Sequence, residues 1–135
     1  MAITIDGTNG ILSASGGLTT IGPTGIGYAT GAGGAVTQLT SKATGVTLNT
    51  VTGQITLNNA ALAAATVASF TLTNSVIAAN DILVLNHISG GTAGAYTLNA
   101  QSAAGSASIN VRNASAGSLS EAIVIAYAVI KSVIA

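Results

Sequence analysis

The chain has 135 residues, which suits one domain with one hydrophobic core. Charged residues make up only 4 % of it, against about 25 % in typical soluble domains, and the formal net charge is zero. Three scattered cations exclude a phosphate-binding footprint for nucleic acid and a polybasic patch for a membrane surface. The absence of cysteine excludes disulfides, thiolate metal sites and cysteine nucleophiles. The charged residues are Lys42, Arg112 and Lys131, and Asp6, Asp81 and Glu121.

The low charge also bears on self-association. Hydrophobic residues make up 49 % of the chain, and much of the polar remainder is Thr, Ser and Asn. A protein with a net charge near zero tends to associate. We therefore expect a surface that copies of the same chain or other partners cover, rather than a free monomer with a hydroxyl- and amide-rich surface.

Residues 1–34 differ from the rest of the chain, because they hold most of the 17 glycines and the single proline, Pro23. Glycine loses the most conformational freedom on folding, so this segment cannot build a core by itself. Its apolar residues nevertheless recur every few positions, which a flexible linker does not require. The pattern predicts an extended arm for assembly contacts, with a disordered tail as the alternative. The apolar residues of the predicted arm are Ile3, Ile5, Ile11, Leu12, Leu18, Ile21 and Ile26.

Residues 35–135 alternate apolar and polar positions between turn residues, which is typical of half-buried strands. About eight strands at short spacing predict an all-β fold, a β-sandwich or jelly-roll-like knob, with a β-solenoid as the rival architecture. We expect the alanine-rich residues 60–65 to connect two strands. The expected strands are residues 36–40, 46–48, 55–57, 70–72, 82–85, 96–98, 109–111 and 122–130.

Several of these expected strands carry more specific predictions. A near-repeat, TGVTLN at residues 44–49 and TGQITLN at residues 52–58, has Asn and Gly between its two halves and predicts a hairpin. Residues 82–85 and 122–130 are apolar at successive positions. Such strands are either central in a sandwich or have one face on the core and the other on a neighbouring subunit.

Side chains able to carry chemistry are rare. His87 is the only histidine, and the carboxylates lack the spacing of zinc or calcium ligands, so we expect a strand-end residue with a hydrogen-bonded ring. No Gly-x-Ser-x-Gly elbow is present, and the glycines of residues 25–34 match neither a dinucleotide loop nor a Walker motif. We therefore predict no enzyme, no catalytic residue, no cofactor and no metal.

The few charges are expected to be structural. An unpaired buried charge is costly, so we predict two ion pairs, Arg112 with Glu121 and Lys42 with Asp81. Asn113-Ala-Ser115 has the pattern of a glycosylation acceptor, but we expect it to form a turn.

Two stretches carry a resemblance to a known group of proteins. Residues 31–49 (GAGGAVTQLTSKATGVTLN) and 117–131 (GSLSEAIVIAYAVIK) resemble small structural proteins of tailed-phage and prophage virions, a likeness that covers about residues 27–131. The opening AITIDGTNG of residues 2–10 is similar to that of fibre-type proteins. The resemblance implies a capsid decoration, cement or head-fibre role, or a terminal domain of a tail fibre, commonly as a trimer. It implies no catalytic residues.

The expected function is therefore non-enzymatic. The leading hypothesis is a trimeric decoration protein on the exterior of a phage capsid, made in the host cytoplasm, whose partners are its own copies and the major capsid protein, not nucleic acid or a membrane. The alternative is a tail-fibre domain that binds host glycans, for which Tyr28 and Tyr96 are the candidates, because we expect Phe70 and Tyr127 in the core. A third hypothesis, an ice-binding surface, rests on two Thr-x-Thr triplets, residues 50–52 and 71–73.

Overall fold

A computed structural model describes residues 25–134 of the chain. These residues form eight strands and no helix, so the predicted all-β sandwich is confirmed. Each expected strand is present, although the bounds differ. The predicted arm residues Ile3, Ile5, Ile11, Leu12, Leu18 and Ile21 lie outside the described residues. The strands are β1 (Gly33–Thr37), β2 (Val46–Thr47), β3 (Thr52–Thr56), β4 (Val67–Thr73), β5 (Ile82–Ser89), β6 (Tyr96–Ala103), β7 (Ser106–Asn113) and β8 (Val124–Ile130).

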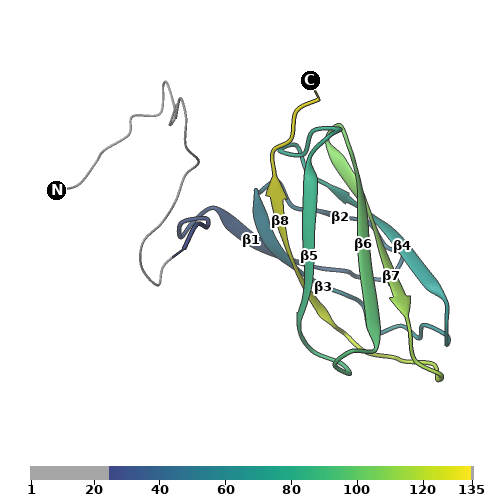
Figure 1. The fold of residues 1–135 in the computed structure, drawn as a ribbon. Helices are drawn as coiled ribbons and strands as arrows, with labels where there is room; N and C mark the ends of the chain where they lie inside the picture. The colour runs from purple at the N-terminus through teal and green to yellow at the C-terminus, as the bar shows by residue number, and fades with distance from the viewer. Residues whose placement is uncertain (1–24, 135) are drawn as a thin grey trace, which may run out of the picture.

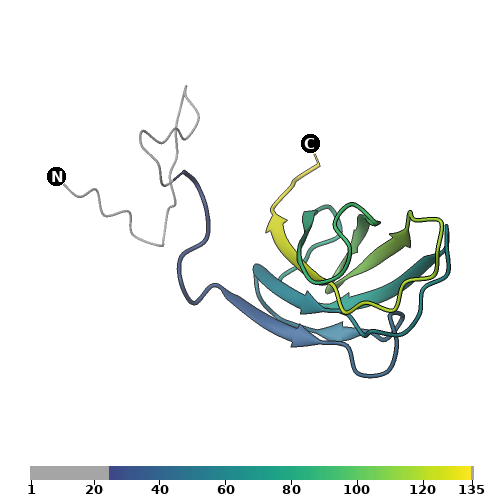
Figure 2. The same ribbon diagram turned by 90° about the horizontal axis from the view of Figure 1, so that it is seen from below.

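The strands form two four-stranded sheets that face one another across the core (Figures 1 and 2). Sheet A has the order β1-β3-β8-β5, and sheet B has the order β2-β4-β7-β6. From β3 onward the chain passes from sheet A to B, back to A, and to B again. It stays in sheet B for the β6–β7 hairpin and returns to sheet A as β8. This alternation between two sheets is the crossing pattern of jelly-roll folds.

The core follows from the two-residue period of the strands. In β8 the side chains of Ile125, Tyr127 and Val129 point inward and are at most 2 % exposed. Their neighbours in the strand are more exposed and lie on the outer face. The expected core positions of Phe70 and Tyr127 are confirmed. The buried apolar residues of β7, an inner strand of sheet B, are Ala107, Ile109 and Val111.

The predicted hairpin between residues 44–49 and 52–58 is wrong. β2 belongs to sheet B and pairs in parallel with β4, whereas β3 belongs to sheet A and pairs in parallel with β1. The physical reason lies in Leu48, whose side chain turns inward over the glycines of β1 and β3. A Cβ atom on Gly34 would lie 2.8 Å from Leu48 Cδ1, and one on Gly53 would lie 2.7 Å from Leu48 Cδ2. The chain therefore crosses from sheet B to sheet A between β2 and β3, whereas a hairpin would have placed both strands in the same sheet.

The two strands with apolar runs have different positions. β8 is central in sheet A, which is one of the two predicted alternatives, but β5 is an edge strand. Ile82 and Val84 of β5 are about half exposed on the outer face. The predicted boundary at residue 34 also shifts slightly, because β1 begins at Gly33. Residues 60–65 form a connection as expected, with a single bridge between Leu62 and Leu119.

Candidate functional site

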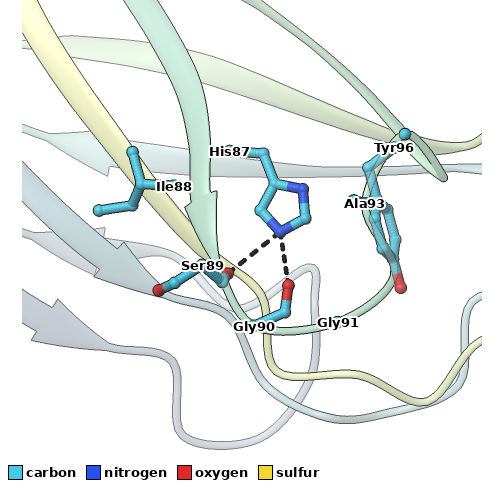
Figure 3. A pocket seen from close by; sticks show the side chains of 8 residues that line it. His87, Ile88, Ser89, Gly90, Gly91, Ala93 and Tyr96 are labelled. Carbon is cyan, nitrogen blue, oxygen red and sulfur yellow. Dashed lines mark hydrogen bonds between the residues drawn. The ribbon is translucent and has the colours of Figure 1, made fainter.

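A pocket of about 300 Å³ lies between the end of β5 and the start of β6 (Figure 3). The rings of His87 and Tyr96 flank it edge to face, with centroids 5.8 Å apart. His87 Nε2 lies 3.1 Å from the carbonyl oxygen of Ser89 and 2.6 Å from that of Gly90. Carbonyl oxygens only accept, so these partners assign the proton to Nε2. The prediction of a strand-end histidine with a hydrogen-bonded ring is confirmed.

Glycines shape the loop that closes this pocket. Gly90, Gly91 and Gly94 all have φ values between 63° and 78°, a region that other residues rarely adopt. A Cβ atom on Gly91 would also lie 2.6 Å from Ile123 Cγ2 and 2.7 Å from Glu121 Oε2. The loop can therefore press closely against the connection that leads into β8.

Glu121 holds this loop in place and does not pair with Arg112, so that predicted ion pair is wrong. The Glu121 carboxylate accepts hydrogen bonds from the backbone N–H of Thr92 at 3.0 Å, from Thr92 Oγ1 at 2.7 Å and from the Tyr96 hydroxyl at 2.9 Å. The bonds from Thr92 are the main reason that the pKa of Glu121 is lowered. Burial and the adjacent carboxylate raise the pKa of Tyr96 to about 12. Arg112 is exposed on sheet B, where strand alternation turns it outward.

Lys42 is buried at the same end of the sandwich, only 3 % exposed. Its Nζ donates to the backbone oxygen of Asn58 at 2.5 Å and to that of Glu121 at 2.6 Å. Burial lowers the pKa of Lys42, and the charge of Glu121 opposes that effect. Gln38 reinforces the cluster by donating to the Lys42 and Thr44 oxygens. Lys42 thus links the backbone of the segment after β3 to the backbone of the segment before β8.

The predicted pair between Lys42 and Asp81 is also wrong, because the two residues lie at opposite ends of the sandwich. Asp81 precedes β5 and forms an ion pair with Lys131 at 2.6 Å. Its Oδ2 also accepts from the backbone N–H of Ala78 at 2.7 Å. That bond, followed by the one from Lys131, lowers the pKa of Asp81.

These polar groups serve the fold of the described chain. Among residues 25–134, no three His, Asp or Glu side chains gather closely enough to hold a metal ion. Every buried side-chain nitrogen and oxygen in that part of the chain has a hydrogen-bond partner.

Asn113 donates to the Leu62 and Gly117 oxygens and accepts from Ser115, so the expected turn at residues 113–115 is confirmed. No helix in the described chain has the length and apolarity to cross a bilayer.

A second candidate is the outer face of sheet A. Ile82 of β5 pairs across the strands with Ile130 of β8, and both are more than half exposed. Val84 pairs with Ala128, and Ala126 follows on the same face. No charged residue of the described chain belongs to the strands of this sheet. Large apolar side chains therefore lie side by side in the open.

The described end of the predicted arm reaches this face. The Tyr28 hydroxyl donates to the Val129 carbonyl oxygen. Ile26 and Tyr28 line a hollow of about 470 Å³ together with Ala128 and Ile130. Of the apolar residues predicted for the arm, Ile26 is the one that lies within residues 25–134. It is 69 % exposed, so its apolar side chain faces the solvent beside sheet A.

The outer face of sheet B is polar. Ser69 Oγ donates to Asn110 Oδ1 at 2.6 Å, and Asn110 Nδ2 donates to Asn99 Oδ1 at 2.6 Å, in a row across three strands. Of the two Thr-x-Thr triplets, residues 50–52 use both hydroxyls internally, since Thr50 donates to the Thr52 oxygen and Thr52 to the Tyr127 oxygen. That leaves one outward triplet, residues 71–73, which makes no regular array.

Comparisons with protein-family models, with curated proteins and with solved structures found no match to this chain.

The pocket residues could not be found from the sequence as a set, because His87 and Tyr96 become neighbours only through the β5–β6 loop. The outer face of sheet A could be anticipated from the sequence, because β5 and β8 have apolar residues at successive positions.

Proposed function

We propose that the chain is a structural protein of a phage particle, a homotrimer that binds the capsid exterior as a decoration or cement protein. The observation that carries this proposal is the cluster of exposed apolar side chains of β5 and β8 on the uncharged outer face of sheet A, where Gln54 and Asn86 are also exposed. A domain of 4 % charged residues with such a face is suited to being covered by neighbours. The resemblance of residues 27–131 to virion proteins supplies the setting.

The mechanism is mechanical. Burial of apolar surface stabilises a contact by about 25 cal/mol per Å² before the costs of association are subtracted. A trimer that touches several capsomers at once adds avidity, because each further contact forms at a high effective concentration. The arm predicted for residues 1–34 is proposed to add contacts with the capsid to each copy.

The direct test is the position of the protein on particles purified from the phage or prophage that encodes it. Cryo-electron microscopy is expected to find the domain on the outside of the capsid lattice. A chain that lacks residues 1–24 is expected to lose binding to undecorated capsids while its circular dichroism spectrum stays that of the full chain. Localisation to the tail, or full decoration by the shortened chain, would contradict the corresponding part of the proposal.

A second candidate function is glycan binding by a tail-fibre domain, and the pocket beside His87 is the observation that favours it. The pocket is open, and His87, Ile88 and Tyr96 line it together with residues of the β5–β6 loop. The Tyr96 ring offers little stacking surface, since the residue is 8 % exposed and its hydroxyl is bonded to Glu121. Binding of the isolated protein to host cells, lost in His87→Ala, would favour this function over the first.

A further inference from the structure

We infer that copies of this chain meet through the outer face of sheet A, and that Ile26 and Tyr28 belong to the same contact. The inference deepens the proposed function, because it rests on the homo-oligomer named there and adds the surface that forms it. The occupant of the face is a second copy of this chain. The apolar residues of the contact are Ile26, Tyr28, Ile82, Val84, Ala126, Ala128 and Ile130.

The fold itself does not require these side chains to be apolar. The core is complete on the inner faces, where Ile125 and Tyr127 are at most 2 % exposed. On the outer face, by contrast, Ile82, Val84 and Ile130 are between 48 and 55 % exposed. Sheet B mostly places Ser, Thr and Asn outward, with Val67 as its one exposed large apolar side chain, 53 % exposed. Apolar residues on two adjacent strands therefore point to a surface that another molecule covers.

The size of the face fits a contact that includes the segment before β1. The strands of sheet A have five residues in β1, five in β3, seven in β8 and eight in β5. At about 3.4 Å per residue and about 4.8 Å between strands, they present roughly 400 Å² per copy. A standard interface buries about 800 Å² on each partner. The strands alone fall short of that area. Ile26 and Tyr28 lie beside Ala128 and Ile130 of β8 and add apolar area to the surface next to that strand.

The charge distribution favours a second copy over a different partner. The described strands of sheet A carry no charge, and the ion pair of Asp81 with Lys131, at the end of the face, is neutralised within the chain. A charged partner would be desolvated here without gaining a counter-charge. The chain's own face is neutral and is apolar over much of β5 and β8. It is present wherever the chain is, and two copies meet no net repulsion because the formal net charge is zero.

The test compares lysine substitutions on the two outer faces of the full chain. Val84→Lys with Ala128→Lys places charges on sheet A, and Thr71→Lys with Gln101→Lys places the same number on sheet B. Sedimentation equilibrium is expected to give self-association at least about tenfold weaker for the sheet A variant and unchanged for the sheet B variant. Circular dichroism checks that both variants fold. A full-length chain that stays monomeric, or equal association of both variants, would overturn the inference.

A cross-linking measurement keeps the inference testable if the lysine variant fails to fold. Because the chain contains no cysteine, a single introduced cysteine reports one position without background. Val84→Cys is expected to cross-link between copies with a short bis-maleimide, and Thr71→Cys is not. If the thiol introduced by Val84→Cys instead stays unreactive in a monomer, the chain's own residues cover the face and the inference is wrong.

The outcomes that would contradict the proposed function differ from those that would overturn this inference. A chain that associates through sheet A but binds no phage particle would contradict the proposed function and leave the inference intact. A monomer whose particle binding is lost in Val84→Lys with Ala128→Lys would overturn the inference, because the capsid would then be the occupant of the face.

Discussion

The outer faces of the two sheets have the same architecture and opposite surface chemistry. Each is the exposed side of a four-stranded sheet. Sheet B turns a hydrogen-bonded row of Ser69, Asn110 and Asn99 toward the solvent. Sheet A turns Ile82 and Ile130 outward as a directly facing pair. One face is satisfied by water and by its own side chains, whereas the other leaves apolar surface exposed.

Lack of charge alone therefore does not identify an assembly surface in this protein. Sheet B has a single charged residue in its strands, Arg112, so both faces are almost uncharged. What separates them is the cluster of Ile82, Val84 and Ile130 on sheet A, whereas sheet B exposes only one large apolar side chain, Val67. Thr and Asn can be hydrated at little cost, but Ile and Val gain only when a partner removes them from water.

Substitutions on the inner and outer faces of one strand should differ most in their effect on stability. In β8, Ile125→Ala removes a fully buried side chain and should lower the free energy of unfolding by about 2–5 kcal/mol. Ile130→Ala, on the outer face, should change it by no more than about 0.5 kcal/mol in dilute, dissociated protein. Urea denaturation measures both. Similar losses would mean that the outer face belongs to the core after all.

The next largest effect concerns the close packing beneath sheet A. A Cβ atom on Gly53 would lie 2.7 Å from Leu48 and 2.9 Å from the Tyr127 ring, so Gly53→Ala should cost about 1–3 kcal/mol. Gly117→Ala is the matched control, since nothing lies within 4 Å of its added Cβ atom. Thermal unfolding is the measurement. An unchanged midpoint for Gly53→Ala would show that Leu48 can move aside freely.

Much of this fold could be predicted from local patterns. Alternation of apolar and polar residues indicated most of the strands, and runs of apolar residues indicated β5 and β8. These patterns also placed Phe70 and Tyr127 in the core. The apolar runs of β5 and β8 also indicated the face that now carries the proposals. These features depend on neighbouring residues in the chain, so one sequence is enough to find them.

Pairing between distant segments could not be predicted in the same way. The parallel edge pairs β1–β3 and β2–β4 depend on a crossing that the Leu48 side chain and two glycines permit. The partners of Glu121 lie 29 and 25 residues earlier, in the β5–β6 loop and at the start of β6, and only the folded sheets determine the position of that loop. With three basic and three acidic residues, several pairings were equally plausible, and both predicted ones were wrong.

A smaller effect should follow pH, because the two ends of sheet A each depend on a carboxylate. The pKa values of Asp81 and Glu121 are lowered in the folded protein. Their contribution to stability is therefore present above the unfolded-state pKa values and is lost as pH falls from about 5 downward. Denaturation midpoints across this range should fall less steeply in Asp81→Asn with Glu121→Gln. An identical slope in that variant would assign the acid sensitivity to other groups.

The smallest effect should come from the polar row on sheet B. Asn110→Ala removes the bonds to Ser69 and Asn99, and such exposed cross-strand pairs contribute only about 0.2–1 kcal/mol. Ser108→Ala, on the same face of β7, is the control, and denaturation in urea distinguishes them. Self-association should be the same in both variants, because this face already satisfies its polar groups. If Asn110→Ala instead changed the oligomeric state, sheet B would also be an assembly surface, and the contrast between the two faces would fail.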